Sequence, residues 1–258
     1  MVFRLSGAVS PIKYVGSKAR IAKDIVPIIQ KCIDENGVNR YIEPFVGGGN
    51  TLSEIKCEHR FAYDKNYYLI SFWKALQGGW QIQDEPMSKE LYDDIRKNKD
   101  NYPEHIVALA GFCATYNAKW FGGYAGIVHT KAGTVRNYYD EAVRNVIKQV
   151  PSIKDVQFMG ASYLHIPFTK GAVIYCDPPY KGTTGYKDAI DYDAYWEWVR
   201  YISKDNYVLC SEYEAPDDFE CIWSKDLTTT LDNASRSKST EKLFTYKNGL
   251  YKKEVCEC

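Results

Sequence analysis

Apolar residues recur along this 258-residue chain with two different periods, which predicts a mixed α/β fold. Isoleucines at helical spacing predict a helix from Lys18 to about Gln30. Short apolar runs predict strands at 40–45, 61–63, 156–158, 172–176 and 207–210. The first strand leads into a glycine-rich loop, then into an expected helix at 51–56 with Asn50 as its N-cap. This order is typical of the front half of a nucleotide-binding α/β unit.

The pattern changes after Gln77. An expected helix at 67–76 precedes the change, and further helices are expected at 88–99, 104–117 and 138–150. Between the last two lie an aromatic, glycine-rich stretch at 120–126 and a polar loop that carries Lys131 and Arg136. We therefore predict a sheet domain formed by residues 1–76 and 155–258. A mainly helical insertion at 77–154 would interrupt it.

The remaining elements complete the expected sheet domain. A helix is expected at 192–203, after the 172–176 strand and before the 207–210 strand. Asn248-Gly249 separates two aromatic, strand-like runs at 242–247 and 250–253, which predicts a two-residue hairpin there.

The 172–176 strand ends in the most informative chemistry of the chain, the tetrapeptide Asp177-Pro178-Pro179-Tyr180. The prolines stop the strand because they cannot donate to a ladder. Asp177 and the Pro178 carbonyl can each accept a hydrogen from a ring-bound amine, while Tyr180 stacks on the ring. Such acceptors push the amine nitrogen towards a nucleophilic geometry. A strand followed by a plain Pro-Pro turn is the structural alternative.

Two further segments indicate a nucleotide-like ligand. Glu43-Pro44-Phe45-Val46 runs into three glycines, Gly47 to Gly49, which would let backbone approach a ligand closely. Asp64 follows at the end of the next strand, where acids commonly bind ribose hydroxyls, although a helix N-cap is the alternative. Lys18 at a helix start suggests an anionic partner, with a plain surface lysine as the alternative. Neither a P-loop nor a G-x-G-x-x-G fingerprint occurs.

Composition narrows the class of protein. The chain has no apolar run long enough to span a membrane and no secretory signal at Met1, so we expect a cytoplasmic protein. Eight scattered cysteines without a C-x-x-C pair indicate reduced thiols and no metal site, with a metal clip at Cys256 and Cys258 as the alternative.

The formal net charge of zero hides a segregation of charge. Residues 111–154 carry six basic and two acidic side chains, and residues 182–222 carry ten acids against three bases. The first segment could steer a polyanion, or both could be ordinary solvated faces.

Three motifs in order resemble the Dam-like (D12 class) DNA adenine-N6 methyltransferases. They are Lys13-Tyr14-Val15-Gly16-Ser17-Lys18, Glu43-Pro44-Phe45-Val46-Gly47-Gly48-Gly49 and the tetrapeptide, and the resemblance covers essentially the whole chain. It implies a Rossmann-like sheet that uses S-adenosyl-L-methionine, with a target-recognition insertion that binds double-stranded DNA. In a bacterial or phage-infected cell, such an enzyme would methylate a flipped-out adenine.

The resemblance also assigns residues. The cofactor contacts would come from Tyr14, Lys18, Glu43, Pro44, Phe45, Gly47, Gly49, Asp64 and Asp177. The catalytic group would be the tetrapeptide, Asp177, Pro178, Pro179 and Tyr180. Within the insertion, Lys119, Lys131 and Arg136 would contact phosphates, and Arg136 with Asn137 would read bases, unless the loop is only a solvated one. Cytosine-N4, RNA or protein-amide methylation, and a catalytically inactive nucleic-acid-binding module, remain alternatives.

Overall fold

A computed structural model describes residues 18–83, 85–116, 119–129, 133–180, 190–232 and 235–253. The strands are β1 (Arg40–Glu43), β2 (His59–Asp64), β3 (Ile127–His129), β4 (Val135–Asn137), β5 (Val156–Gly160), β6 (Val173–Cys176), β7 (Tyr207–Glu212), β8 (Phe219–Asp232) and β9 (Ser235–Tyr246). The α-helices are α1 (Ala22–Glu35), α2 (Tyr67–Gln77), α3 (Lys89–Lys97), α4 (Glu104–Ala108), α5 (Tyr138–Gln149), α6 (Tyr192–Ile202) and α7 (Leu250–Lys253). Short 3-10 turns and one π-helical turn (Leu109–Cys113) complete the elements.

Seven strands form one mixed sheet in the order β5-β2-β1-β6-β7-β9-β8. The central pairs β1–β2, β1–β6 and β6–β7 are parallel, and β9 runs antiparallel to both β7 and β8. After β1 the chain adds β2 on one side of that strand, and it later adds β6 on the other side. This reversal confirms the predicted Rossmann-like α/β sheet, in which ligands bind beyond the carboxyl ends of the strands at the switch point.

The chain divides into two compact units. One comprises Met1–Ala22, Gly47–Glu54 and Asn66–Phe158, and the other comprises Lys23–Val46, Ile55–Lys65 and Met159–Cys258. The expected insertion at 77–154 lies within the first unit, together with the glycine loop and α2. Most of the sheet and α6 belong to the second.

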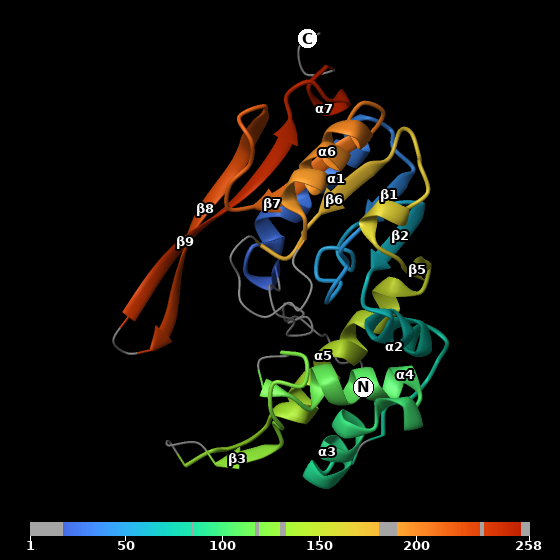
Figure 1. Cartoon of the computed structure of the whole chain (residues 1–258), viewed down its shortest axis with the longest axis vertical. Helices are drawn as coiled ribbons and strands as arrows, with labels where there is room; N and C mark the ends of the chain where they lie inside the picture. Colours follow the sequence, from blue (N-terminus) through green and yellow to red (C-terminus); the bar gives the residue numbers. More distant parts are fainter. Residues whose placement is uncertain are drawn as a thin grey trace, which may run out of the picture. The chain divides into compact units, whose positions relative to one another are not determined.

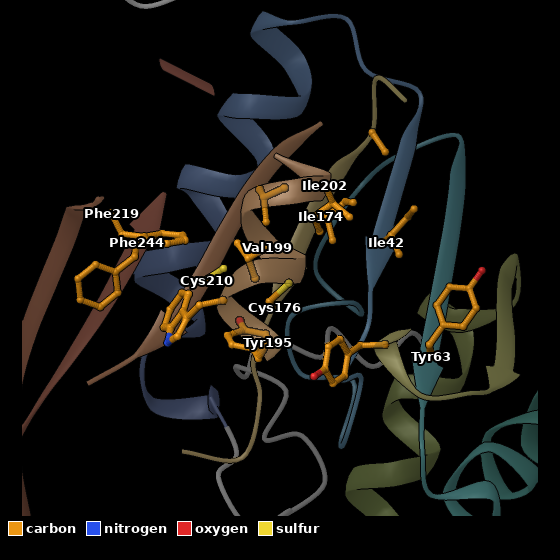
Figure 2. Close-up of a cluster of buried hydrophobic side chains, with 14 residues drawn as sticks. Ile42, Tyr63, Ile174, Cys176, Tyr195, Val199, Ile202, Cys210, Phe219 and Phe244 are labelled. Carbon is orange, nitrogen blue, oxygen red and sulfur yellow. The ribbon is translucent and has the colours of Figure 1, made fainter. Parts of the chain in front are cut away.

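The second unit has a core between α6 and one face of the sheet (Figures 1 and 2). Tyr195, Val199 and Ile202 of α6 pack with Ile174 and Cys176 of β6 and with alternate residues of β1 and β7. All four residues of β6 are buried because both of its faces are covered, as is usual for a parallel strand. Tyr41, Tyr175 and Ser211 point to the opposite face, on which the Tyr175 hydroxyl and Ser211 share a 2.8 Å hydrogen bond.

The first unit is mainly helical, and three of the predicted helices are confirmed as α2, α3 and α5. Each begins at a side-chain cap, from Asn66, Ser88 and Asn137 respectively. The fourth expected helix, at 104–117, is α4 continued by the π-helical turn as far as Cys113. The predicted polar loop is in part a β3–β4 hairpin, in which Val128 pairs with Arg136.

The expected helix at 51–56 is wrong. Residues 50–54 form turns, in which Ser53 N donates to Gly49 O and Glu54 N donates to Thr51 O. The helix does not continue because Lys56 N donates to Gln30 Oε1 at 2.9 Å. Asn50 is therefore not a helix N-cap, although Leu52 and Ile55 are buried as the apolar pattern indicated.

The hairpin predicted around Asn248-Gly249 is also wrong. The 242–246 run belongs to β9, where Phe244 pairs with Cys210 of β7 and with Cys221 of β8. With a strand on each side, β9 has no edge to offer residues 250–253. These residues form α7, and Leu250 N donates to Ser203 O instead.

Candidate active site

Four neighbouring parallel strands of the second unit end in acids. β2 ends at Asp64, β1 at Glu43 and β7 at Glu212, and Asp177 directly follows β6. Because carboxyl ends of parallel strands meet at one edge of a sheet, these acids line a single edge. The sequence predicts Asp64 and Asp177 at strand ends, whereas the expected strand at 40–45 places Glu43 inside it. The structure ends β1 at Glu43.

Glu43 is almost fully buried, with 3% of its surface exposed. Its Oε1 accepts a 2.6 Å hydrogen bond from the Tyr41 hydroxyl. Burial is the main cause that raises the pKa of Glu43 to about 8; the Tyr41 hydrogen bond and Arg60 oppose the rise, and the charge of Asp177 adds to it. Glu43 is therefore mostly protonated at neutral pH, and it lies within electrostatic reach of Asp177.

Asp64 is half-buried at the end of β2, and its carbonyl accepts from Ala161 N at 3.1 Å. It does not cap α2, because Asn66 occupies the N-cap and accepts from Leu69 N. The N-cap alternative for Asp64 is therefore wrong.

The tetrapeptide is held through its last two residues. The Tyr192 hydroxyl donates to Pro179 O, and the Tyr180 hydroxyl donates to Glu241 Oε2 at 2.8 Å. The Tyr213 ring meets Tyr180 edge to face, with 4.5 Å between ring centroids. Among the residues that the structure describes, no donor reaches the Pro178 carbonyl.

Tyr180 is an un-ionised donor in this arrangement. Burial, followed by the charges of Asp177 and Glu241, raises the pKa of Tyr180 well above its usual value. Its 9% exposure means that the protein already surrounds most of the ring.

Pro44 and Phe45 pack into the second unit. The Phe45 ring lies 5.4 Å from Tyr163 and 6.0 Å from Tyr195, measured between centroids. Pro44 lines an apolar cavity of about 150 Å³, together with Ile42 and Trp198 among others. None of the four strand-end acids lines this cavity, so its apolar surface does not mark the acidic edge.

The glycine loop belongs to the first unit. Gly47 and Gly49 have φ of 48° and 62°, a region that favours glycine. Trp73 Nε1 donates to Gly47 O at 3.2 Å, and Gln149 Nε2 donates to Gly48 O at 3.1 Å and to Gly49 O at 3.4 Å. Side chains from α2 and α5 therefore fix the loop through its carbonyls.

The N-terminal motif is described only from Lys18. Lys18 lies in a 3-10 turn before α1 and is 6% exposed, so it is not a plain surface lysine. Tyr14 lies outside the described residues.

The predicted DNA contacts have different surroundings. Lys119 is exposed, and Lys131 lies outside the described residues. Arg136 is held by Glu141 through two hydrogen bonds, of 2.9 and 2.6 Å, and its guanidinium lies 4.7 Å from the centre of the Tyr138 ring. Asn137 caps α5, since its Oδ1 accepts from Asp140 N.

The sequence assigned no role to Tyr192, Glu212, Glu241 or Gln149, although the segments 211–213 and 236–244 loosely resemble C-terminal elements of the same family. Glu212 had a usable signal, because it ends a buried strand as Asp177 does. Gln149 stands at i+3 from Val146 on the buried stripe of α5, where a polar residue is unusual. Tyr192 and Glu241 carried no local signal, since their partners lie 13 and 61 residues away.

The described part of the chain contains neither a membrane-spanning helix nor a cluster of metal ligands. None of its helices is long and apolar enough to cross a bilayer. In the same residues, no three His, Cys, Asp or Glu side chains gather as a metal site would require.

Comparisons with known proteins agree on one family. The chain is 24% identical over 197 residues to type II methyltransferase M.FokI of Planomicrobium okeanokoites, which covers 68% of this chain and 29% of the relative. It is 26% identical over 201 residues to type II methyltransferase M.MjaIII of Methanocaldococcus jannaschii, which covers 66% of this chain and 68% of the relative. Modification methylase StsI of Streptococcus sanguinis is 23% identical over 197 residues, 29% of its length.

The chain thus spans less than a third of M.FokI and of StsI, but about two thirds of M.MjaIII. A family model also matches residues 14–197, a range that includes the glycine loop, the insertion and the tetrapeptide. The chain therefore belongs to the D12 class of N6 adenine-specific DNA methyltransferases.

Proposed function

We propose that this protein is a site-specific DNA methyltransferase that transfers a methyl group from S-adenosyl-L-methionine to N6 of adenine in double-stranded DNA. The observation that carries this proposal is the state of the tetrapeptide. Among described residues the Pro178 carbonyl has no donor, whereas the Pro179 carbonyl and the Tyr180 hydroxyl are both engaged within the protein. Within the described part of the chain, this leaves the acceptor beside Asp177 for a substrate amine.

The donor set at the strand ends fits S-adenosylmethionine. Asp64 and Asp177 are acceptors suited to the ammonium and ribose hydroxyl groups of that molecule, and Glu43, mostly protonated, would bound the same edge. Gly47 and Gly49 would hold its methionine portion through backbone, and Pro44 and Phe45 shape the adjoining strand end. Lys18, with Tyr14 from the resemblance, completes the proposed contacts. When bound, S-adenosylmethionine supplies an electrophilic methyl group.

The protein's own residues activate the amine. Asp177 Oδ and the Pro178 carbonyl accept one N–H each, which draws the lone pair of the nitrogen out of conjugation with the ring. Asp177 also accepts the proton that the nitrogen loses as it is methylated. Tyr180 stacks on the base, and Pro179 sets the backbone direction between the two.

The amine of a stacked, paired adenine is out of reach, so the base must leave the duplex at a cost of a few kcal/mol. Phosphate contacts from Lys119, Lys131 and Arg136 would hold the flanking DNA, with Arg136 and Asn137 as base-reading candidates. Because Arg136 is paired with Glu141 and Asn137 caps α5, either side chain must exchange an internal partner for DNA.

The test is transfer of a tritiated methyl group to unmethylated duplex DNA, with duplex RNA and protein as parallel substrates. The DNA is then digested to nucleosides. The proposal predicts N6-methyladenosine from the wild-type protein and none from Asp177→Ala. Label in N4-methylcytosine, in RNA or in protein would identify one of the alternative substrates, and label that survives Asp177→Ala would refute the mechanism.

A further inference from the structure

Tyr192 contacts the tetrapeptide from the first residue of α6. Its hydroxyl donates to Pro179 O, and it also lies 2.9 Å from Glu212 Oε2. The start of α6 is itself fixed, because the Asp191 carboxylate caps it and accepts from Asp193 N and Ala194 N at 3.1 Å each. The hydroxyl therefore stands at a defined position between a strand-end acid and the tetrapeptide.

Glu212 provides a rigid anchor for this hydroxyl. It is the last residue of β7, is 2% exposed, and its Oε1 accepts from Tyr213 N at 2.8 Å. β7 runs parallel to β6 with Cys210 opposite Cys176. A movement of Glu212 relative to the tetrapeptide would require the central sheet to shift.

The Tyr192 hydroxyl is the donor in both of these contacts. The Tyr192 hydroxyl has one hydrogen and two oxygen neighbours, Pro179 O and Glu212 Oε2. Burial, and then the hydrogen bond to Glu212, raises the pKa of Tyr192, so the hydroxyl keeps its hydrogen. The hydroxyl hydrogen therefore serves two acceptors, Pro179 O and Glu212 Oε2, and ties the tetrapeptide to the end of β7.

We infer that Tyr192, held by Glu212, is a positioning residue for methyl transfer. By occupying Pro179 O it fixes the Pro179–Tyr180 peptide and leaves the preceding carbonyl, that of Pro178, directed at the amine. Neither residue touches the reacting atoms. The inference rests on the proposed function, since it assigns the tetrapeptide its role in holding the amine.

The decisive variant is Tyr192→Phe, which removes only the hydroxyl. We expect kcat to fall by about 10- to 100-fold, because small misplacements of reacting groups cost rates of this order. Dissociation constants for S-adenosylmethionine and duplex DNA should change by less than about threefold. Tyr201→Phe is the matched control, because Tyr201 lies on the same helix with 56% of its surface exposed. A Tyr192→Phe kcat within twofold of the wild type would overturn the inference.

A second pair of variants tests the anchor. In Glu212→Gln the amide can accept from Tyr213 N and donate to the Tyr192 oxygen, so kcat should stay within about threefold of the wild type. Glu212→Ala should lose rate as Tyr192→Phe does, while Glu214→Gln, at an exposed position two residues away, should not. If Glu212→Ala kept a kcat within twofold of the wild type, Glu212 would not anchor Tyr192.

A crystal structure of Tyr192→Phe separates this inference from the proposed function. The inference expects the Pro179–Tyr180 peptide to leave its wild-type position, with α6 and β7 unchanged, and this readout needs no methyl transfer. An unmoved peptide would refute the positioning role even if the enzyme methylates adenine. If the wild type methylated another amine, the proposed substrate would fail, and a slow Tyr192→Phe would still support positioning.

Discussion

The buried carboxyl group of Glu43 leads to a prediction about stability that needs no activity assay. The perturbation is Glu43→Gln, which keeps the size of the side chain and an acceptor for the Tyr41 hydroxyl but removes the titration. In the folded protein, burial raises the pKa of Glu43 from its usual 4.5 to about 8. The folded state therefore holds a proton that the unfolded chain releases as the pH rises above 4.5.

The magnitude follows from linkage. Stability falls with pH wherever the folded state binds more protons, here between 4.5 and about 8, by up to 1.36 kcal/mol per pH unit. Over this whole pH range the wild type loses about 5 kcal/mol of stability, and about 3 kcal/mol of this loss has occurred by pH 7. Rearrangement around the charged carboxylate reduces these values. Above pH 8 both states are ionised and the penalty is constant.

The assay is urea unfolding of the wild type and Glu43→Gln at intervals from about pH 5 to pH 9. All other titrating groups are common to both proteins, so the difference in unfolding free energy reports Glu43 together with its charge coupling to Asp177. We expect Glu43→Gln to gain a few kcal/mol on the wild type between pH 5 and pH 8. Glu54→Gln, at an exposed position, should show no such gain. A difference between wild type and Glu43→Gln that is flat over this range would refute the reasoning.

Two further predictions concern the first unit. Gln149→Leu removes the donor to Gly48 O and Gly49 O. We expect it to destabilise the protein by about 2 kcal/mol in urea unfolding and to weaken S-adenosylmethionine binding in calorimetry. Unchanged values would show that the conformation of the glycine loop does not depend on Gln149. Lys119→Ala should lower affinity for duplex DNA and reduce the salt slope by about one, while Arg136→Ala should have a smaller effect because Glu141 already neutralises it. Equal effects in a salt titration would contradict that ranking.

The sequence predicted the central elements because each carries a local signal. Continuous apolar runs identified β6 and β7, helical spacing identified α2 and α5, and the expected strand ends placed Asp64 and Asp177 on one edge. A parallel sheet converts such local signals into a site, because its strands all end at the same side.

The errors have non-local causes. The turns at 50–54 do not continue as a helix through residue 56, because Gln30 takes the Lys56 N–H from 26 residues away. The Asn248-Gly249 hairpin failed because β7 and β8 already flank β9. Tyr192 and Glu241 reach the tetrapeptide only through the tertiary fold, so no window of sequence would have identified them.

The most direct test of the central claim is single-turnover methyl transfer to a duplex adenine by Asp177→Asn. The substitution keeps the volume of the side chain but replaces one acceptor oxygen by a donor amide and removes the proton acceptor. With S-adenosylmethionine and DNA both saturating, we expect the rate to fall at least about 100-fold. A rate within about threefold of the wild type would mean that the Asp177 carboxylate does not activate the amine.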